Sequence, residues 1–110
     1  MADFIKVATT SQLPPGSMLG AKAGNLDVLV VNVGGKFYAM RGICTHRGGI
    51  LSNGKLEGNV VTCPRHGSQF DVTTGKNLAG PKILGIRGTT GDEPAYEIKV
   101  EGGDILVRTP

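Results

Sequence analysis

Every cysteine and histidine of the chain lies in one of two short segments. The first segment, GICTHRGG, holds Cys44 and His46, and the second, TCPRHGSQFD, holds Cys63 and His66. Each segment therefore offers one potential thiolate ligand and one potential imidazole ligand. Two short, closely spaced Cys and His pairs are the kind of pattern that marks a metal site. A fold for this chain must bring these two distant segments together.

The rest of the sequence alternates short apolar runs with turn residues. The segment LDVLVVNVGGKFYAM has two β-branched or aromatic runs around Gly34 and Gly35, which predicts a β-hairpin. The 18 glycines favour tight turns and disfavour long helices, and no long window has helical periodicity. We therefore expect an all-β fold. Further strands are predicted at Phe4–Ala8, Asn59–Thr62, Ser68–Val72, Tyr96–Val100 and Ile105–Arg108.

Length and composition exclude several classes of protein. A chain of 110 residues is expected to form one domain, spanning residues 1–110. The net charge of +3 is spread along the sequence and tryptophan is absent, so we expect no nucleic-acid partner. The N-terminus lacks the features of a signal peptide, and no apolar run is long enough to cross a bilayer. We expect a cytoplasmic protein with no membrane partner.

The residues alone leave several types of site open. A disulfide between Cys44 and Cys63 would leave both histidines unexplained and is disfavoured in a reducing cytoplasm. A structural zinc ion accepts two cysteines and two histidines, although zinc fingers usually pair like with like. A catalytic cysteine–histidine pair would need only one segment. A binuclear iron centre uses both mixed segments, because each can give its cysteine to one iron and its histidine to the other.

The chain resembles Rieske-type ferredoxins along nearly its whole length, from FIKVATTSQLPPG to DILV. The specific part of the likeness is CTHRGG followed by GKLEGNVVTCPRHGSQFDVTTG. The resemblance implies an antiparallel Rieske-type β-sandwich with a small cluster-binding subdomain, at about residues 42–81, formed by two glycine-rich loops. It also implies one [2Fe-2S] cluster, with Cys44 and Cys63 on one iron and His46 and His66 on the other.

The resemblance assigns roles to neighbours of the ligands as well. It places Pro81 in a third loop that covers the cluster, and it makes Ser68 similar to a serine that bonds a bridging sulfide in high-potential relatives. Phe70 stands where those relatives have a tyrosine. Three glycines are expected to let backbone N–H groups approach the cluster sulfurs, which raises the potential. These glycines are Gly48, Gly49 and Gly67.

A prediction for the redox potential follows from this ligand set. Replacing two thiolates with two neutral imidazoles makes the oxidised cluster less negative, so Rieske centres span about −150 to +300 mV against about −400 mV for plant-type ferredoxins. Quinol-oxidising relatives also carry an extra disulfide, at positions occupied here by Gly49 and Arg65. Because that disulfide and the tyrosine hydroxyl are missing, we expect a potential that is negative or near zero. Exposed histidine ligands should make it fall at alkaline pH.

The resemblance implies a soluble one-electron carrier rather than an enzyme. It would take electrons from a flavoprotein or other reductase and pass them to an oxygenase or another redox enzyme, docking transiently as a monomer. An oxygenase of this type would continue into a mononuclear iron domain, so we do not expect a chain that ends at Pro110 to be an oxygenase. Two alternatives stay open: a small Rieske subunit of a multi-component oxidoreductase, and a zinc-binding interaction module.

Two features of the sequence have no assigned function. Residues 88–94, GTTGDEP, form a polar segment without an identifiable role. Basic residues outnumber acidic ones around the two ligand segments, and this excess is interpreted as a solvated face in preference to a docking rim for an acidic partner. The basic residues are Arg41, Arg47, Arg65 and Lys76, and the acidic ones are Glu57 and Asp71.

Overall fold

The computed structural model describes residues 4–43, 50–64, 67–79, 82–83, 86–87 and 95–108. Within these ranges the chain consists of strands, turns and two single-turn 3-10 helices, and every strand pairing is antiparallel. The predicted all-β antiparallel fold is therefore confirmed. The elements are β1 (Phe4–Thr9), η1 (Thr10–Gln12), β2 (Met18–Ala23), β3 (Leu26–Val33), β4 (Lys36–Arg41), η2 (Leu51–Asn53), β5 (Lys55–Glu57), β6 (Val60–Thr62), β7 (Gln69–Asp71), β8 (Asn77–Ala79), β9 (Lys82–Ile83), β10 (Ile86–Arg87), β11 (Ala95–Glu101) and β12 (Asp104–Arg108).

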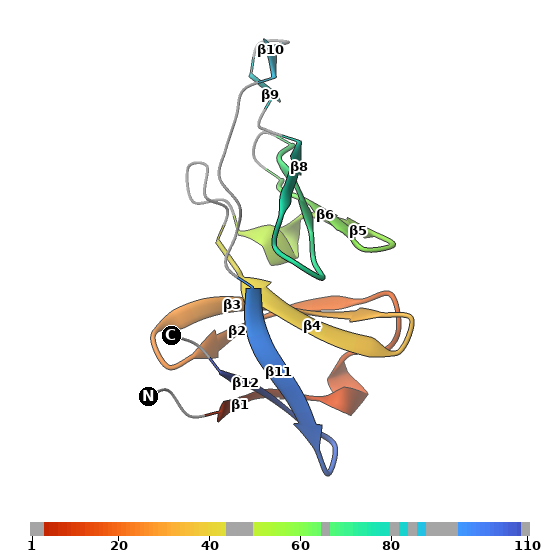
Figure 1. The fold of residues 1–110 in the computed structure, drawn as a ribbon, viewed down its shortest axis with the longest axis vertical. Helices are drawn as coiled ribbons and strands as arrows, with labels where there is room; N and C mark the ends of the chain where they lie inside the picture. The colour runs from red at the N-terminus through yellow and green to blue at the C-terminus, as the bar shows by residue number, and fades with distance from the viewer. Residues whose placement is uncertain are drawn as a thin grey trace.

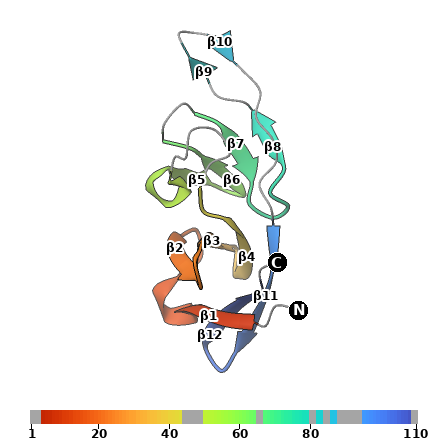
Figure 2. The same cartoon turned by 90° about the vertical axis from the view of Figure 1, so that its left-hand side faces the viewer.

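The larger sheet has six strands in the order β1-β12-β11-β4-β3-β2 and forms the lower half of Figure 1. We call this part the base sheet. The predicted hairpin between β3 and β4 is present, with Val33 opposite Lys36 and with Gly34 and Gly35 at φ 61° and 95°. These positive φ angles are the reason that two glycines suit the turn. The first and last strands of the chain, β1 and β12, are neighbours in this sheet (Figure 2).

Strand β3 separates two hydrophobic cores. Leu29 and Val31 point into a core shared with the smaller sheet, whereas Val28 and Val30 point into a core within the base sheet. All four side chains are at most 1% exposed. Side chains alternate between the two faces of a strand, and both faces of β3 are covered, so its sequence is a continuous apolar run.

The smaller sheet has the strand order β5-β6-β7-β8 and lies above the base sheet in Figure 1. Val61 of β6, Phe70 of β7 and Val72, which directly follows β7, pack in the same cluster as Leu29 and Val31 of β3. The two sheets are therefore held together by one shared core. This arrangement fixes the smaller sheet, and the ligand segment that it carries, on the base sheet.

Several predicted strands need correction. Predicted Asn59–Thr62 and Ser68–Val72 are shorter in the structure, as β6 and β7, and Phe4–Ala8 extends to Thr9 as β1. The sequence did not predict β2, β5 or β8, which pair with β3, β6 and β7. The strands β8 and β9 lie on either side of Gly80 and Pro81 in the sequence; these two residues and residues 88–94 lie outside the described residues.

Among the described residues, no helix is long and apolar enough to cross a membrane.

Candidate metal centre

One of the four predicted ligands, Cys63, lies among the described residues. Cys44, His46 and His66 lie outside them, as do Gly48, Gly49, Arg65 and Pro81. The described part of the chain contains no group of three or more potential metal-binding side chains. The site is therefore built here from Cys63, from its neighbours in the second segment, and from the two residues that flank the first.

Cys63 directly follows β6 and is 3% exposed. Its thiol forms no disulfide. Its backbone N–H donates to the Ser68 carbonyl at 2.7 Å, and its carbonyl accepts from the Gly67 N–H at 3.2 Å. These two hydrogen bonds close residues 63–68 into a loop between β6 and β7. Gly67 has φ 78°, a conformation that favours glycine.

The amide of Gly67 thus has a backbone partner, the Cys63 carbonyl. The proposed approach of the Gly67 N–H to a cluster sulfur stays a prediction. The positive φ nevertheless gives a physical reason for glycine at this position, because a side chain would strain the turn. Gly67 therefore contributes to the shape of the loop, whatever its amide contacts.

Ser68 is the described residue whose surroundings point most directly to a bound group. Its side chain is 1% exposed, and its Oγ has no hydrogen-bond partner among the described residues. An unsatisfied buried hydroxyl costs about 1–3 kcal/mol. Because its carbonyl accepts a hydrogen bond from the Cys63 N–H, Ser68 lies opposite Cys63 in the loop. A hydroxyl donor beside a buried cysteine fits a sulfur acceptor, such as a cluster sulfide.

Phe70 is completely buried and packs in the core that contains Cys63, Val61 and Leu51. It lies opposite Val61 in the β6–β7 ladder. Its ring therefore supports the strand that leads to Cys63 and offers no hydrogen-bond donor.

The first ligand segment is closed at its base by residues that the structure describes. Ile43 and Ile50, on either side of residues 44–49, form an isolated antiparallel bridge. Gly42 donates its N–H to the Asp27 carbonyl at 2.9 Å and accepts from the Leu51 N–H at 2.9 Å. A Cβ at Gly42 would lie 3.0 Å from the backbone of Val28. The first segment is thus anchored on β3, whose Leu29 shares a core with Cys63.

An acidic residue near the site has a structural role that the sequence analysis missed. Asp71 Oδ1 accepts from the Thr73 N–H at 2.9 Å, from Thr73 Oγ1 at 2.6 Å and from Asn59 Nδ2 at 3.2 Å. The bond from the Thr73 hydroxyl, above all, lowers the pKa of Asp71 below its ordinary value. The stabilisation it gives is complete above the unfolded-state pKa and is lost as pH falls through the folded-state pKa. Asp-x-Thr is a turn pattern that could have indicated this.

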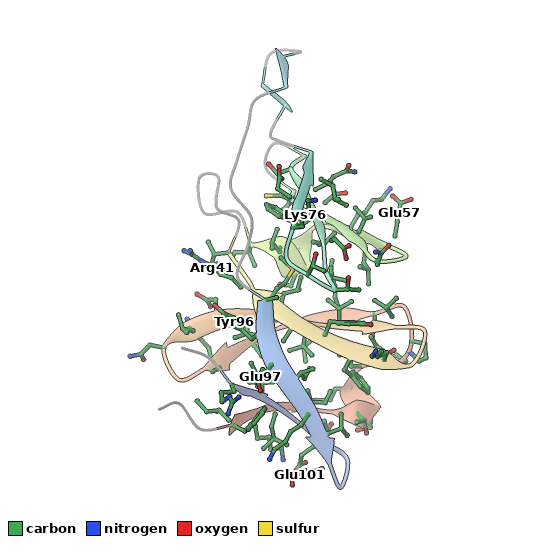
Figure 3. All side chains as sticks on the ribbon, in the orientation of Figure 1. Arg41, Glu57, Lys76, Tyr96, Glu97 and Glu101 are labelled. Carbon is green, nitrogen blue, oxygen red and sulfur yellow. The ribbon has the colours of Figure 1, made fainter. Side chains whose placement is uncertain are left out.

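Charges are distributed unevenly over the described residues. Arg41 and Lys76, two members of the predicted basic set, are exposed; in Figure 3, Arg41 lies at the upper end of β4 and Lys76 in the upper half of the molecule. The four ion pairs that the structure shows all lie in the base sheet. They are Lys6–Asp104, Lys22–Asp27, Lys99–Glu101 and Arg108–Glu97.

The fold and the site together define a small antiparallel β protein in which a buried cysteine lies in the same loop as a serine hydroxyl that has no partner among the described residues. Residues 3–88 match the family model described as "Rieske [2Fe-2S] domain". The chain belongs to this family, so its cofactor is a [2Fe-2S] cluster.

Several curated proteins are similar to the chain over almost all of both lengths. The ferredoxin component of biphenyl 2,3-dioxygenase from Rhodococcus jostii (strain RHA1) is 39% identical over 102 residues, which cover 93% of this chain and 89% of the relative. The ferredoxin component of the naphthalene 1,2-dioxygenase/salicylate 5-hydroxylase systems from Ralstonia sp is 32% identical, covering 96% of this chain and 95% of the relative.

Solved structures agree with this assignment. The ferredoxin of carbazole 1,9a-dioxygenase from Nocardioides aromaticivorans IC177 superposes with a TM-score of 0.81 at 31% identity, covering 97% of this chain and 98% of that one. A chain in the complex of reduced oxygenase and oxidized ferredoxin in carbazole 1,9a-dioxygenase gives a TM-score of 0.82 at 33% identity, covering 96% and 92%. The predicted Rieske-type fold is confirmed.

Proposed function

We propose that the protein is a one-electron carrier that receives electrons from a reductase, a flavoprotein or another type, and delivers them to an oxygenase. Relatives of nearly equal length that are named as ferredoxin components support this role over that of an enzyme. A neighbouring structure is a complex of an oxygenase with its ferredoxin, which supports an oxygenase as the acceptor.

Cys44, His46, Cys63 and His66 would hold the cluster, and the whole chain, residues 1–110, would form a single Rieske domain with a cluster-binding subdomain at about residues 42–81. When bound, the cluster supplies a centre that takes up and releases one electron. The protein holds the Cys63 thiolate in a buried, hydrogen-bonded loop. Fixed dipoles around a redox centre avoid reorganisation when its charge changes.

The observation that carries the proposal is the Ser68 hydroxyl, which is buried across the loop from Cys63 and lacks a described partner. A cluster sulfur provides the acceptor that this hydroxyl needs, and the hydrogen bond would stabilise the more negative, reduced cluster. Apolar packing alone gives no reason for a serine at a position that is 1% exposed.

The remaining features of the function are also proposals. We place the carrier in the cytoplasm as a monomer, with no nucleic-acid or membrane partner. Transient docking on the reductase and the oxygenase requires exposed histidine ligands, and Gly48, Gly49 and Pro81 would shape the loops around them. The potential is expected to be negative or near zero, since Phe70 offers no hydroxyl to a cysteine sulfur.

Metal analysis of the purified protein tests the carrier role. We expect equal amounts of iron and acid-labile sulfide, and a visible absorption that bleaches on reduction with dithionite and returns on reoxidation. A colourless protein that holds zinc would refute the proposal and support a zinc-binding interaction module.

A further inference from the structure

Gly54 lies where η2 ends and β5 begins, and the structure leaves no room there for a side chain. Its backbone is extended, with φ −88° and ψ −154°, so no unusual dihedral angle requires glycine. A Cβ at Gly54 would clash with the Thr62 carbonyl oxygen and would lie 3.1 Å from the Thr62 carbonyl carbon. The constraint on this position is therefore a close contact with the backbone of β6.

The carbonyl that Gly54 contacts belongs to the peptide unit that leads into Cys63. Because a peptide unit is planar, the Thr62 C=O and the Cys63 N–H move together. That N–H donates to the Ser68 carbonyl at 2.7 Å, one of the two hydrogen bonds that close the 63–68 loop. Any displacement of the Thr62 oxygen would therefore tilt the donor that holds the loop, and Cys63 with it.

Open space adjoins the residues of this contact. Gly54, Thr62, Cys63 and Pro64 border a hollow of about 260 Å³ beside the loop. The base sheet takes no part in this contact. Thr62 belongs to β6 of the smaller sheet, and Gly54 directly precedes Lys55 of β5, which pairs with Thr62. A side chain at position 54 would thus shift the peptide locally rather than disrupt the whole fold.

We propose that Gly54 is a positioning residue for Cys63: the absence of its side chain sets the orientation of the Thr62–Cys63 peptide and thereby the placement of the thiolate and of Ser68. The role of Cys63 as a cluster ligand rests on the proposed function. The contact of Gly54 with Thr62 does not.

Gly20 provides a matched control. It also lies in extended structure, in β2, and it also faces the turn η2. A Cβ at Gly20 would meet the Ser52 side chain, with Oγ at 2.7 Å. A serine hydroxyl can rotate away, whereas the Thr62 carbonyl is part of the backbone. The same glycine-to-alanine change therefore has different consequences at the two positions.

The experiment compares the iron-loaded wild type with Gly54→Ala and Gly20→Ala. Hydrogen–deuterium exchange is measured in peptides covering residues 60–70 and, as a reference, the β3–β4 hairpin. In Gly54→Ala we expect exchange at residues 60–70 to accelerate at least about tenfold, with the β3–β4 hairpin unchanged. The EPR spectrum of the reduced cluster should change and its potential should shift, while Gly20→Ala keeps the wild-type values.

Two results would overturn the inference. One is a Gly54→Ala protein with wild-type exchange, spectrum and potential. The other is loss of protection in the β3–β4 hairpin as well, because Gly54 would then be needed by the whole fold. Failure of the proposed function would look different: the wild-type protein itself would lack iron and sulfide, while the exchange difference between the two variants would remain measurable.

Discussion

At the scale of single residues, the site depends on polar groups placed in an apolar setting. Cys63 and Ser68 are both at most 3% exposed. The Cys63 N–H donates a hydrogen bond to the Ser68 carbonyl. These two backbone groups thus have partners, while the serine hydroxyl has none among the described residues. This combination leaves one donor available for a group that the protein must bind.

Replacing Ser68 with alanine should lower the midpoint potential of the cluster. A hydrogen bond to a charged group contributes about 1.5–3 kcal/mol, part of which distinguishes the reduced from the oxidised state. A differential of about 1–2 kcal/mol corresponds to roughly 40–90 mV for one electron. A redox titration of Ser68→Ala, beside the exposed control Ser11→Ala, measures the shift. An unchanged potential would show that the hydroxyl does not bond the cluster.

At the scale of elements, the sequence predicted those strands and turns whose structure depends on neighbouring residues in the chain. The β3–β4 hairpin was predicted because Gly34 and Gly35 supply its turn. The strands β2, β5 and β8 were missed because MLGAKA, KLE and NLA have weak strand patterns and become strands by pairing with neighbours. The contact of Gly54 with Thr62 was equally beyond prediction, since it depends on how η2 meets β6.

Asn32 of β3 links two turns and gives a prediction at this scale. It is 3% exposed; its Nδ2 donates to the Leu13 carbonyl at 2.8 Å and its Oδ1 accepts from the Gly35 N–H at 2.7 Å. Asn32→Ala leaves both groups without this partner, which should lower the free energy of unfolding by about 1–3 kcal/mol. Urea denaturation measures the loss, and Asn25→Ala in the exposed β2–β3 turn serves as control. Equal stability of the two variants would contradict this role.

At the scale of the whole molecule, the large base sheet and the candidate ligand Cys63 belong to different halves of the structure. The molecule measures 47 × 30 × 18 Å; its first and last strands, β1 and β12, belong to the base sheet, whereas Cys63 follows β6 of the smaller sheet. The ion pairs found among the described residues also lie in the base sheet.

The sequence was enough to predict the type of the candidate site and its four ligands. The spacing of Cys44, His46, Cys63 and His66 indicated a metal site, and the resemblance to a known family indicated which one. The sequence could not show that the Ser68 hydroxyl is buried without a described partner, or that Asp71 organises the turn after β7. Both follow from tertiary packing and hydrogen bonding.

The central claim is that two histidines and two cysteines share one cluster. Electron–nuclear double resonance of the dithionite-reduced protein, prepared with ¹⁵N-labelled histidine, tests it most directly. We expect hyperfine coupling of the cluster electron spin to two histidine nitrogens, and loss of one coupling or of the whole cluster in His66→Cys. A reduced cluster with no coupling to histidine nitrogen would contradict the claim.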